Sequence, residues 1–162
     1  MYIVNRFILR DLLRHFKYQT AGMCQTARKS VITLGLQKYD DLIVCQKAMD
    51  LVVEVYKIAN LLPNEEMYAL SNQMKRAAVS IPSNIAEGQE RNSTKDFIKH
   101  LHIAKGSKGE LETQLLICVR LQYLTQLQIE IAQCLLTEIG KMLNALIQSL
   151  NAKLSQPPFQ DI

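Results

Sequence analysis

The sequence is poor in the residues that punctuate β-rich folds. Among 162 residues there are only six glycines and four prolines. A sandwich or barrel needs turn residues at intervals of about 8–12 residues, so this composition favours helices. Tryptophan is absent and the ten tyrosines and phenylalanines are scattered, so the sequence offers no aromatic platform of the kind on which single-stranded nucleic acids stack.

Long apolar runs and paired cysteines are also missing. No uninterrupted apolar run approaches the ~18 residues that span a bilayer, and Arg6, Arg10 and Asp11 interrupt any N-terminal signal-like stretch. Four cysteines, at positions 24, 45, 118 and 134, lie far apart without a C-x-x-C pair. The pattern predicts buried, reduced thiols in a cytoplasmic protein, and no membrane location is expected.

Arrangements of residues that carry catalysis or metal binding are absent as well. His100 and His102 are two residues apart, so on a helix they point about 200° away from each other and cannot share a metal. Gly106 and Gly109 follow no predicted strand and lack the phosphate-loop pattern, so a phosphate-binding loop is not expected there. The simpler interpretation is that these small residues allow a neighbouring helix to approach closely. No nucleophile motif or E-x-x-H pair occurs. We therefore expect no enzymatic activity, no cofactor and no metal.

What is present is helical periodicity. Apolar residues recur at helical spacing in four segments, over about residues 42–62, 66–89, 95–124 and 128–154. Asp40 or Asp41 can cap the first segment, and Ser93 or Thr94 the third. Short connections predict an all-α, antiparallel, up-down-up-down four-helix bundle over residues 39–154. Residues 1–38 are predicted to be a basic extension, amphipathic or poorly ordered, and residues 155–162 a frayed tail.

The second segment contains a proline in "AAVSIPSNIAEGQE", residues 77–90. Proline inside a helix costs about 3 kcal/mol, because it lacks an amide hydrogen and clashes with the carbonyl four residues earlier. Ile81 and Ile85 nevertheless keep the apolar stripe in phase, and nearby Ser and Asn side chains can satisfy freed backbone groups. The sequence predicts a helix kinked at Pro82 that continues to Gly88 or Gln89. Whether Asn84 and Glu87 face a functional surface stays open.

The first and fourth segments each carry two apolar stripes, more than a simple coiled-coil seam requires. This surplus predicts a subunit interface, although a monomer with a broad core is the alternative. The residues predicted to form the interface are Val44, Leu51, Val55, Ile58, Leu136, Leu143 and Ile147.

Positive charge is concentrated at the N-terminus. Residues 1–38 hold seven Lys/Arg against one Asp, whereas residues 39–162 hold 12 Lys/Arg against 14 Asp/Glu. The first 16 residues form a cationic amphipathic pattern that suits a membrane surface or nucleic acid, and it also mimics an organellar transit peptide. A translation start at Met23 is a further alternative.

Basic residues also follow the second and third segments. Exposed lysines and arginines on one face meet nucleic-acid phosphates, but they are also compatible with an ordinary solvated face. The candidate nucleic-acid-binding residues are Lys75, Arg76, Lys95, Lys99, Lys105 and Lys108.

Three motifs carry a resemblance to a known family: "L-x-V-x-Q-K-A-M-D-L" at 42–51, "R-A-A-V-S-I-P-S-N-I-A-E-G" at 76–88 and "G-E-L-E-T-Q-L" at 109–115. Over about residues 39–150 the chain resembles the bacterial four-helix-bundle family named for 23S rRNA intervening-sequence proteins. It departs from the family pattern at Cys45, where a tryptophan is usual, and at Glu90. Residues 1–38 lie outside the pattern.

The resemblance implies a ring-forming homo-oligomer, typically a pentamer, without known catalytic residues. It also implies RNA or the ribosome as a partner, because some family members are encoded inside insertions of the large ribosomal RNA gene. A related branch consists of retroelement accessory proteins, which bind a reverse transcriptase and its RNA. We therefore expect a non-enzymatic, RNA-associated oligomer, with a protein-interaction scaffold as the alternative.

Overall fold

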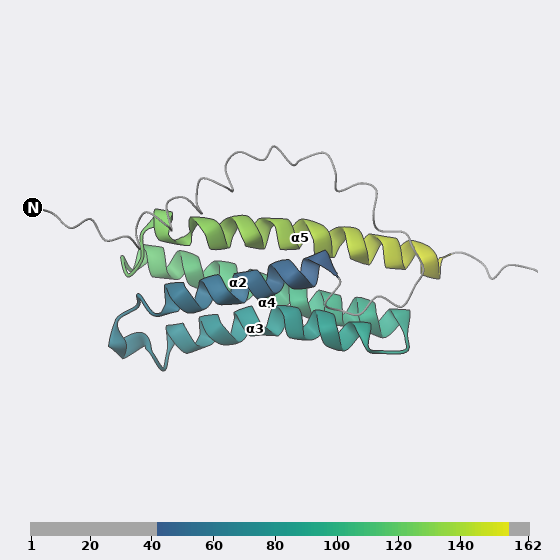
Figure 1. The fold of residues 1–162 in the computed structure, drawn as a ribbon, viewed down its shortest axis with the longest axis horizontal. Helices are drawn as coiled ribbons and strands as arrows, with labels where there is room; N and C mark the ends of the chain where they lie inside the picture. Colours follow the sequence, from purple (N-terminus) through teal and green to yellow (C-terminus); the bar gives the residue numbers. More distant parts are fainter. Residues whose placement is uncertain (1–41, 156–162) are drawn as a thin grey trace, which may run out of the picture. The chain divides into compact units, whose positions relative to one another are not determined.

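The computed structural model describes residues 42–155, which form a bundle of four long helices (Figure 1). Each helix packs against its two neighbours: α2 and α4 both contact α3 and α5, and no diagonal contact is found. The all-α four-helix bundle is thus confirmed. The predictions for residues 1–38 and for the tail beyond Ser155 lie outside the described residues. The elements are α2 (Ile43–Ala59), the 3₁₀-helix η2 (Asn64–Glu66), α3 (Leu70–Gln89), α4 (Thr94–Arg120) and α5 (Gln126–Leu154).

Local hydrogen bonds explain where the helices begin. Ser93 caps α4 by accepting a hydrogen bond from the Asp96 amide at 3.4 Å. Thr125 caps α5 through a reciprocal capping box with Gln128, as the residue pattern T-x-x-Q allows. The N-cap of α2 is Leu42, which makes no side-chain cap bond. Asp40 and Asp41 lie outside the described residues.

Two predicted boundaries were wrong by several residues. The second helix was expected to begin near Glu66, but Asn64–Glu66 form a 3₁₀ turn and α3 begins at Leu70. The third was expected to reach Leu124, but α4 ends at Arg120. Gln122 has a φ of 61°, and the amides of Tyr123 and Leu124 both turn back to the Cys118 carbonyl. This left-handed residue ends the helix, although leucine and tyrosine continue the apolar pattern.

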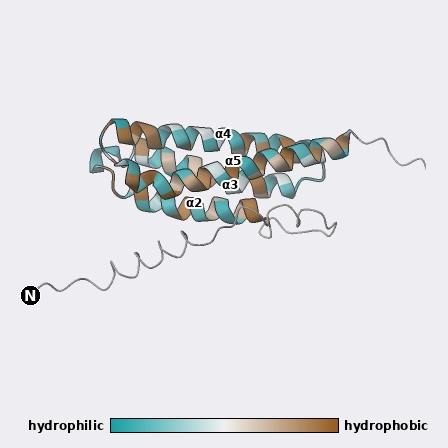
Figure 2. Ribbon diagram, turned by 90° about the horizontal axis from the view of Figure 1, so that it is seen from above, coloured by the Kyte–Doolittle hydropathy of each residue, from teal (hydrophilic) through white to brown (hydrophobic). Residues whose placement is uncertain are grey.

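The core lies along the bundle axis and takes apolar side chains from all four helices, whose hydrophobic and hydrophilic residues alternate along each ribbon (Figure 2). Cys45 and Cys118 are buried in it, as predicted for the thiols, and burial raises the pKa of Cys118 to about 11. Cys134 is exposed, which contradicts the prediction for that residue. Cys24 lies outside the described part.

The residues predicted to form an oligomer interface lie instead in the core of this single chain. Val44 and Ile147 are the most exposed of them, at only 6% and 7%; the others, Leu51, Val55, Ile58, Leu136 and Leu143, are 3% exposed or less. The prediction is wrong at these positions, because a helix in a four-helix core buries an apolar face wider than one a/d stripe. Part of the other stripe of α2 reaches the surface, where Met49 and Tyr56 are exposed.

Helix α3 continues through Pro82 and ends at Gln89, as predicted. Two side chains bond to backbone carbonyls just before the proline: Ser83 Oγ donates to Val79 O and Asn84 Nδ2 donates to Ser80 O, both at 2.8 Å. Ile81 and Ile85 are both fully buried, so the stripe stays in phase across the proline. The kink itself stays a prediction.

Gly88 allows α3 and α4 to approach closely near their connection. A Cβ added at Gly88 would lie 2.7 Å from His100 Cβ and 2.8 Å from Phe97 Cδ2, both on α4. Because His100 Cβ is attached directly to the backbone, only a shift of the helices could relieve that contact. At Gly106 and Gly109, in contrast, an added Cβ would meet nothing within 4 Å.

These environments predict opposite effects of the same substitution. Gly88→Ala should lower the free energy of unfolding by about 1–3 kcal/mol, because overpacking outweighs the better helix propensity of alanine. Gly106→Ala should raise it by about 0.5–1 kcal/mol, because only the propensity term changes. Urea unfolding followed by circular dichroism at one protein concentration measures both. An equal change in the free energy of unfolding of the two variants would contradict the close contact between α3 and α4 at Gly88.

Candidate functional site

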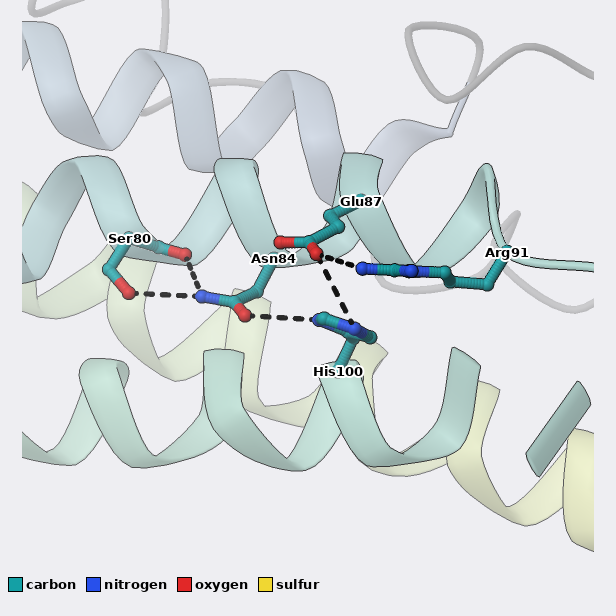
Figure 3. Close-up of polar contacts among 5 residues, drawn as sticks. All are labelled: Ser80, Asn84, Glu87, Arg91 and His100. Atoms are coloured by element: carbon teal, nitrogen blue, oxygen red, sulfur yellow. Dashed lines mark hydrogen bonds and ion pairs between the residues drawn. The ribbon is translucent and has the colours of Figure 1, made fainter. Parts of the chain in front are cut away.

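A chain of polar contacts joins α3 to α4 beside Gly88 (Figure 3). The Asn84 side chain donates from Nδ2 to Ser80 O and, at 3.0 Å, to Ser80 Oγ, while its Oδ1 lies 3.3 Å from His100 Nδ1. His100 Nε2 lies 3.8 Å from Glu87 Oε1, which accepts a hydrogen bond from Arg91 at 2.5 Å. A serine pair, Ser80 and Ser107, extends the chain of contacts along the same seam at 2.8 Å.

The contacts fix the roles of the groups. Because Asn84 Nδ2 donates to two oxygens of Ser80, Oδ1 is the atom that faces His100. An amide oxygen only accepts, so His100 Nδ1 must carry a hydrogen. The Asn84 amide is therefore fully engaged inside the protein. This network holds two helices in register and leaves neither the amide nor Nδ1 free for a ligand.

Glu87 is the charged end of this network. The hydrogen bond from Arg91 holds the pKa of the Glu87 carboxyl below its usual value, and the charges of His100 and Arg91 act in the same direction against partial desolvation. A carboxyl with a lowered pKa favours the folded state as long as it is ionised. Glu87 is therefore part of the α3–α4 contact rather than a proton donor at neutral pH.

The six candidate nucleic-acid-binding residues do not form one surface. Arg76, Lys95, Lys99 and Lys105 are exposed and make no ion pair within residues 42–155. Lys95 and Lys99 are one turn apart on α4, whereas Lys105 follows Lys99 by six residues, a rotation of about 240° on a helix. Lys105 therefore lies on a different flank of α4 from Lys95 and Lys99.

Lys75 and Lys108 are engaged elsewhere. Lys75 Nζ lies over the Tyr56 ring, 5.4 Å from its centroid, in a cation–π contact. Lys108 forms an ion pair with Glu112 one turn further along α4, and its stem packs 3.2 Å from the position of a Cβ at Gly140 on α5. This packing explains the lysine that interrupts the apolar heptads of α4: its methylenes cover a glycine while its ammonium is neutralised at the rim.

The described residues contain no group of three or more His, Cys, Asp or Glu placed to hold a metal ion. Within the same residues no helix is long and apolar enough to cross a membrane. A hollow along α5 places Cys134 between Glu130 and Glu138. Glu138 also forms an ion pair with Lys47 of α2 at 2.5 Å.

Some of these contacts could have been predicted from spacing, and others could not. Ser80 with Asn84, Glu87 with Arg91, and Lys108 with Glu112 are all four residues apart, so a helix brings each pair together. The contact of His100 with Asn84 spans 16 residues and depends on the packing of α3 on α4. Helix spacing alone therefore identifies no partner for His100.

The lowered pKa of Glu87 gives a pH prediction. The ionised Glu87 carboxylate stabilises the folded state at pH values above the ordinary carboxyl pKa. This stabilisation is lost as the pH falls through the pKa that Glu87 has in the folded state. The free energy of unfolding of Glu87→Gln should therefore fall less steeply than that of the wild type between about pH 5 and pH 3. Urea titrations at several pH values measure this slope.

Glu90→Gln is the matched control, because Glu90 is exposed and forms no ion pair in the described part of the chain. Its slope should equal that of the wild type. If Glu87→Gln also followed the wild-type slope, the Arg91 and His100 contacts would contribute nothing to folding.

Comparisons with known proteins agree with the motifs. None of the curated proteins compared with the chain matches it. One similar solved structure is a protein of unknown function from the S23 ribosomal protein family of Bacteroides thetaiotaomicron, 33% identical, with a TM-score of 0.61. The match covers 65% of this chain and 99% of that one. Residues 40–145 match the family described as 23S rRNA-intervening sequence protein. With its three motifs and its four-helix bundle, the chain belongs to the 23S rRNA-intervening sequence protein family.

Proposed function

We propose that the protein is a non-enzymatic homo-oligomer of the cytoplasm that associates with RNA, and with ribosomal RNA in particular. Membership of the intervening-sequence family is the observation that carries this proposal. The exposed cations Arg76, Lys95, Lys99 and Lys105 lack ion-pair partners among residues 42–155 and supply the chemistry for phosphate contacts.

The charge of one subunit is modest. Residues 42–155 contain 12 Lys/Arg and 11 Asp/Glu, a net charge of +1. Two or three phosphate contacts per bundle give weak binding on their own. In a ring, the same cations are repeated by symmetry, and linked sites bind one RNA far more tightly than each site alone. An oligomer, with five subunits as the family resemblance implies, is therefore part of the proposed mechanism.

A protein partner is the second candidate function. Large apolar side chains are exposed at the end of the bundle where the α2–α3 and α4–α5 connections lie: Leu61, Met67, Tyr68, Leu121 and Leu127. Exposed apolar groups of this kind suit a protein better than RNA. A reverse transcriptase gene beside the gene for this protein would favour this scaffold function, and a ribosomal RNA locus would favour the first.

The RNA proposal predicts a salt-dependent interaction through Lys95 and Lys99. Binding to structured fragments of 23S rRNA, followed by fluorescence anisotropy, should weaken steeply as salt rises, because phosphate contacts release counterions. Lys95→Ala/Lys99→Ala should weaken binding and reduce the slope of log K against log salt by about 1–2 per subunit engaged.

Lys141→Ala/Lys153→Ala removes the same charge from α5 and is the matched control, because both lysines are exposed and form no ion pair within residues 42–155. It should leave the slope close to that of the wild type. Wild-type binding weaker than ~10⁻⁴ M that is also insensitive to salt would contradict the proposal, because it would show no phosphate contact.

A further inference from the structure

Gln114 of α4 is a polar side chain buried in the bundle. The residue is 5% exposed, and its Nε2 donates a hydrogen bond to Glu110 Oε1 at 3.0 Å. Its Oε1 is also buried, and this oxygen has no hydrogen-bond partner within residues 42–155. A buried acceptor without a donor destabilises the folded state, so most such groups in proteins are paired. Gln114 therefore needs a donor that a neighbouring group can bring to it.

Turning the amide over does not supply this donor. In the reversed orientation Oε1 of Gln114 would lie against the Glu110 carboxylate, and both of these groups only accept hydrogen bonds. The Glu110 carboxylate thus fixes the direction of the amide, and Oε1 points away from it. The donor has to come from another part of the bundle.

Gln114 faces α3. It follows Ser107 by seven residues, about two helical turns, so the two side chains point to the same side of α4. Ser107 contacts Ser80 of α3 at 2.8 Å. One turn after Gln114, Cys118 Sγ lies 3.6 Å from Met74 Sδ of α3. Because α3 and α4 are antiparallel, these two contacts enclose the stretch of α3 that lies opposite Gln114.

The stretch of α3 opposite Gln114 is residues 73–78, counted along both helices from the two contacts. Its side-chain donors are Gln73, Lys75 and Arg76. Lys75 lies over an aromatic ring of α2, on the other side of α3. Gln73 and Arg76 precede the serine that contacts α4 by about two turns and one turn, so both lie on the side of α4.

Arg76 is the donor that fits both acceptors of this site. Arg76 and Glu110 are exposed, and neither forms an ion pair in the described part of the chain. A guanidinium carries five N–H donors in a planar fork, so it can donate to the Gln114 oxygen and to the Glu110 carboxylate at the same time. The uncharged amide of Gln73 would leave the carboxylate without a counter-charge. Axes of packed helices are about 8–10 Å apart, a distance that an arginine and a glutamate side chain bridge together.

We propose that Arg76 has a second, closed position over the contact between α3 and α4, in which its guanidinium donates to Gln114 Oε1 and to the Glu110 carboxylate. In the exposed position that the structure shows, the same guanidinium is free to contact a phosphate. One guanidinium cannot occupy both positions, so the closed contact is autoinhibitory, and RNA has to displace Arg76 from it. The autoinhibition rests on the RNA binding of the proposed function, whereas the closed contact does not.

A double-mutant cycle in urea tests the closed contact without RNA. Gln114→Met keeps the length of the side chain and removes its polar atoms. It should lower the urea midpoint of the full chain when Arg76 is present, because a hydrogen bond is lost. It should raise the midpoint of Arg76→Ala, because an unpaired buried oxygen is removed. Equal changes in the two backgrounds would overturn the inference.

Gln73→Ala is the matched control background, because Gln73 is the other donor on this side of α3. Gln114→Met should change the midpoint of Gln73→Ala as it changes that of the wild type. A reversed sign in this background would assign the donor to Gln73 and overturn the inference. Circular dichroism shows whether each variant is folded. If Gln114→Met is not, Glu110→Gln at an exposed position takes its place in the cycle, and it should lower the midpoint more with Arg76 than without it.

Binding to the structured fragments of 23S rRNA tests the autoinhibition. Glu110→Gln should strengthen binding about two- to five-fold, because it weakens the closed contact of Arg76. In the Arg76→Ala background the gain should be smaller, since only the loss of one negative charge remains. An equal gain with and without Arg76 would overturn the autoinhibition. Absence of RNA binding together with a non-additive urea cycle would contradict the proposed function and support the closed contact.

Discussion

The structure depends on the close contact between α3 and α4 at Gly88. Only a residue without a Cβ fits there, because His100 Cβ and Phe97 occupy the space that a side chain would need. This approach brings His100 within reach of Asn84 and Glu87, so that polar contacts continue the packing along the seam. The central motif of residues 76–88 thus encodes a helix–helix contact, with the glycine setting the distance and the asparagine and glutamate setting the register.

The same packing decides which surfaces are left for partners. The four helices bury or partly bury both apolar stripes of α5 and most of those of α2, so the excess of apolar residues in the sequence mostly fills one core. The apolar groups that stay exposed are fewer, and they are spread over the outer faces of all four helices and the connections at one end of the bundle. An oligomer built from this chain has to use such residual surfaces.

Some of the cationic residues contribute to helix packing, whereas others are exposed to solvent. A lysine stem can cover apolar atoms while its ammonium stays at the rim, so Lys75 and Lys108 contribute to packing although their sequence positions suggest a phosphate-binding face. Without these two, four of the six candidate residues are exposed and form no ion pair within residues 42–155: Arg76, Lys95, Lys99 and Lys105.

The sequence by itself determined the fold class, the cap at Ser93 and the continuity of α3 through Pro82. The cap at Thr125, which the expected start near residue 128 missed, and the ion pairs spaced four residues apart are local features as well. These features depend on periodicity and on backbone groups a few residues away, which the sequence specifies directly. Only the tertiary structure decided which stripe of α2 faces inward, where α4 ends, and that Asn84 meets His100. Those outcomes depend on the rotation of each helix about its axis and on the distance between neighbouring helices. A helix with several apolar stripes can face the core in more than one rotation, so the periodicity of its sequence does not decide between them.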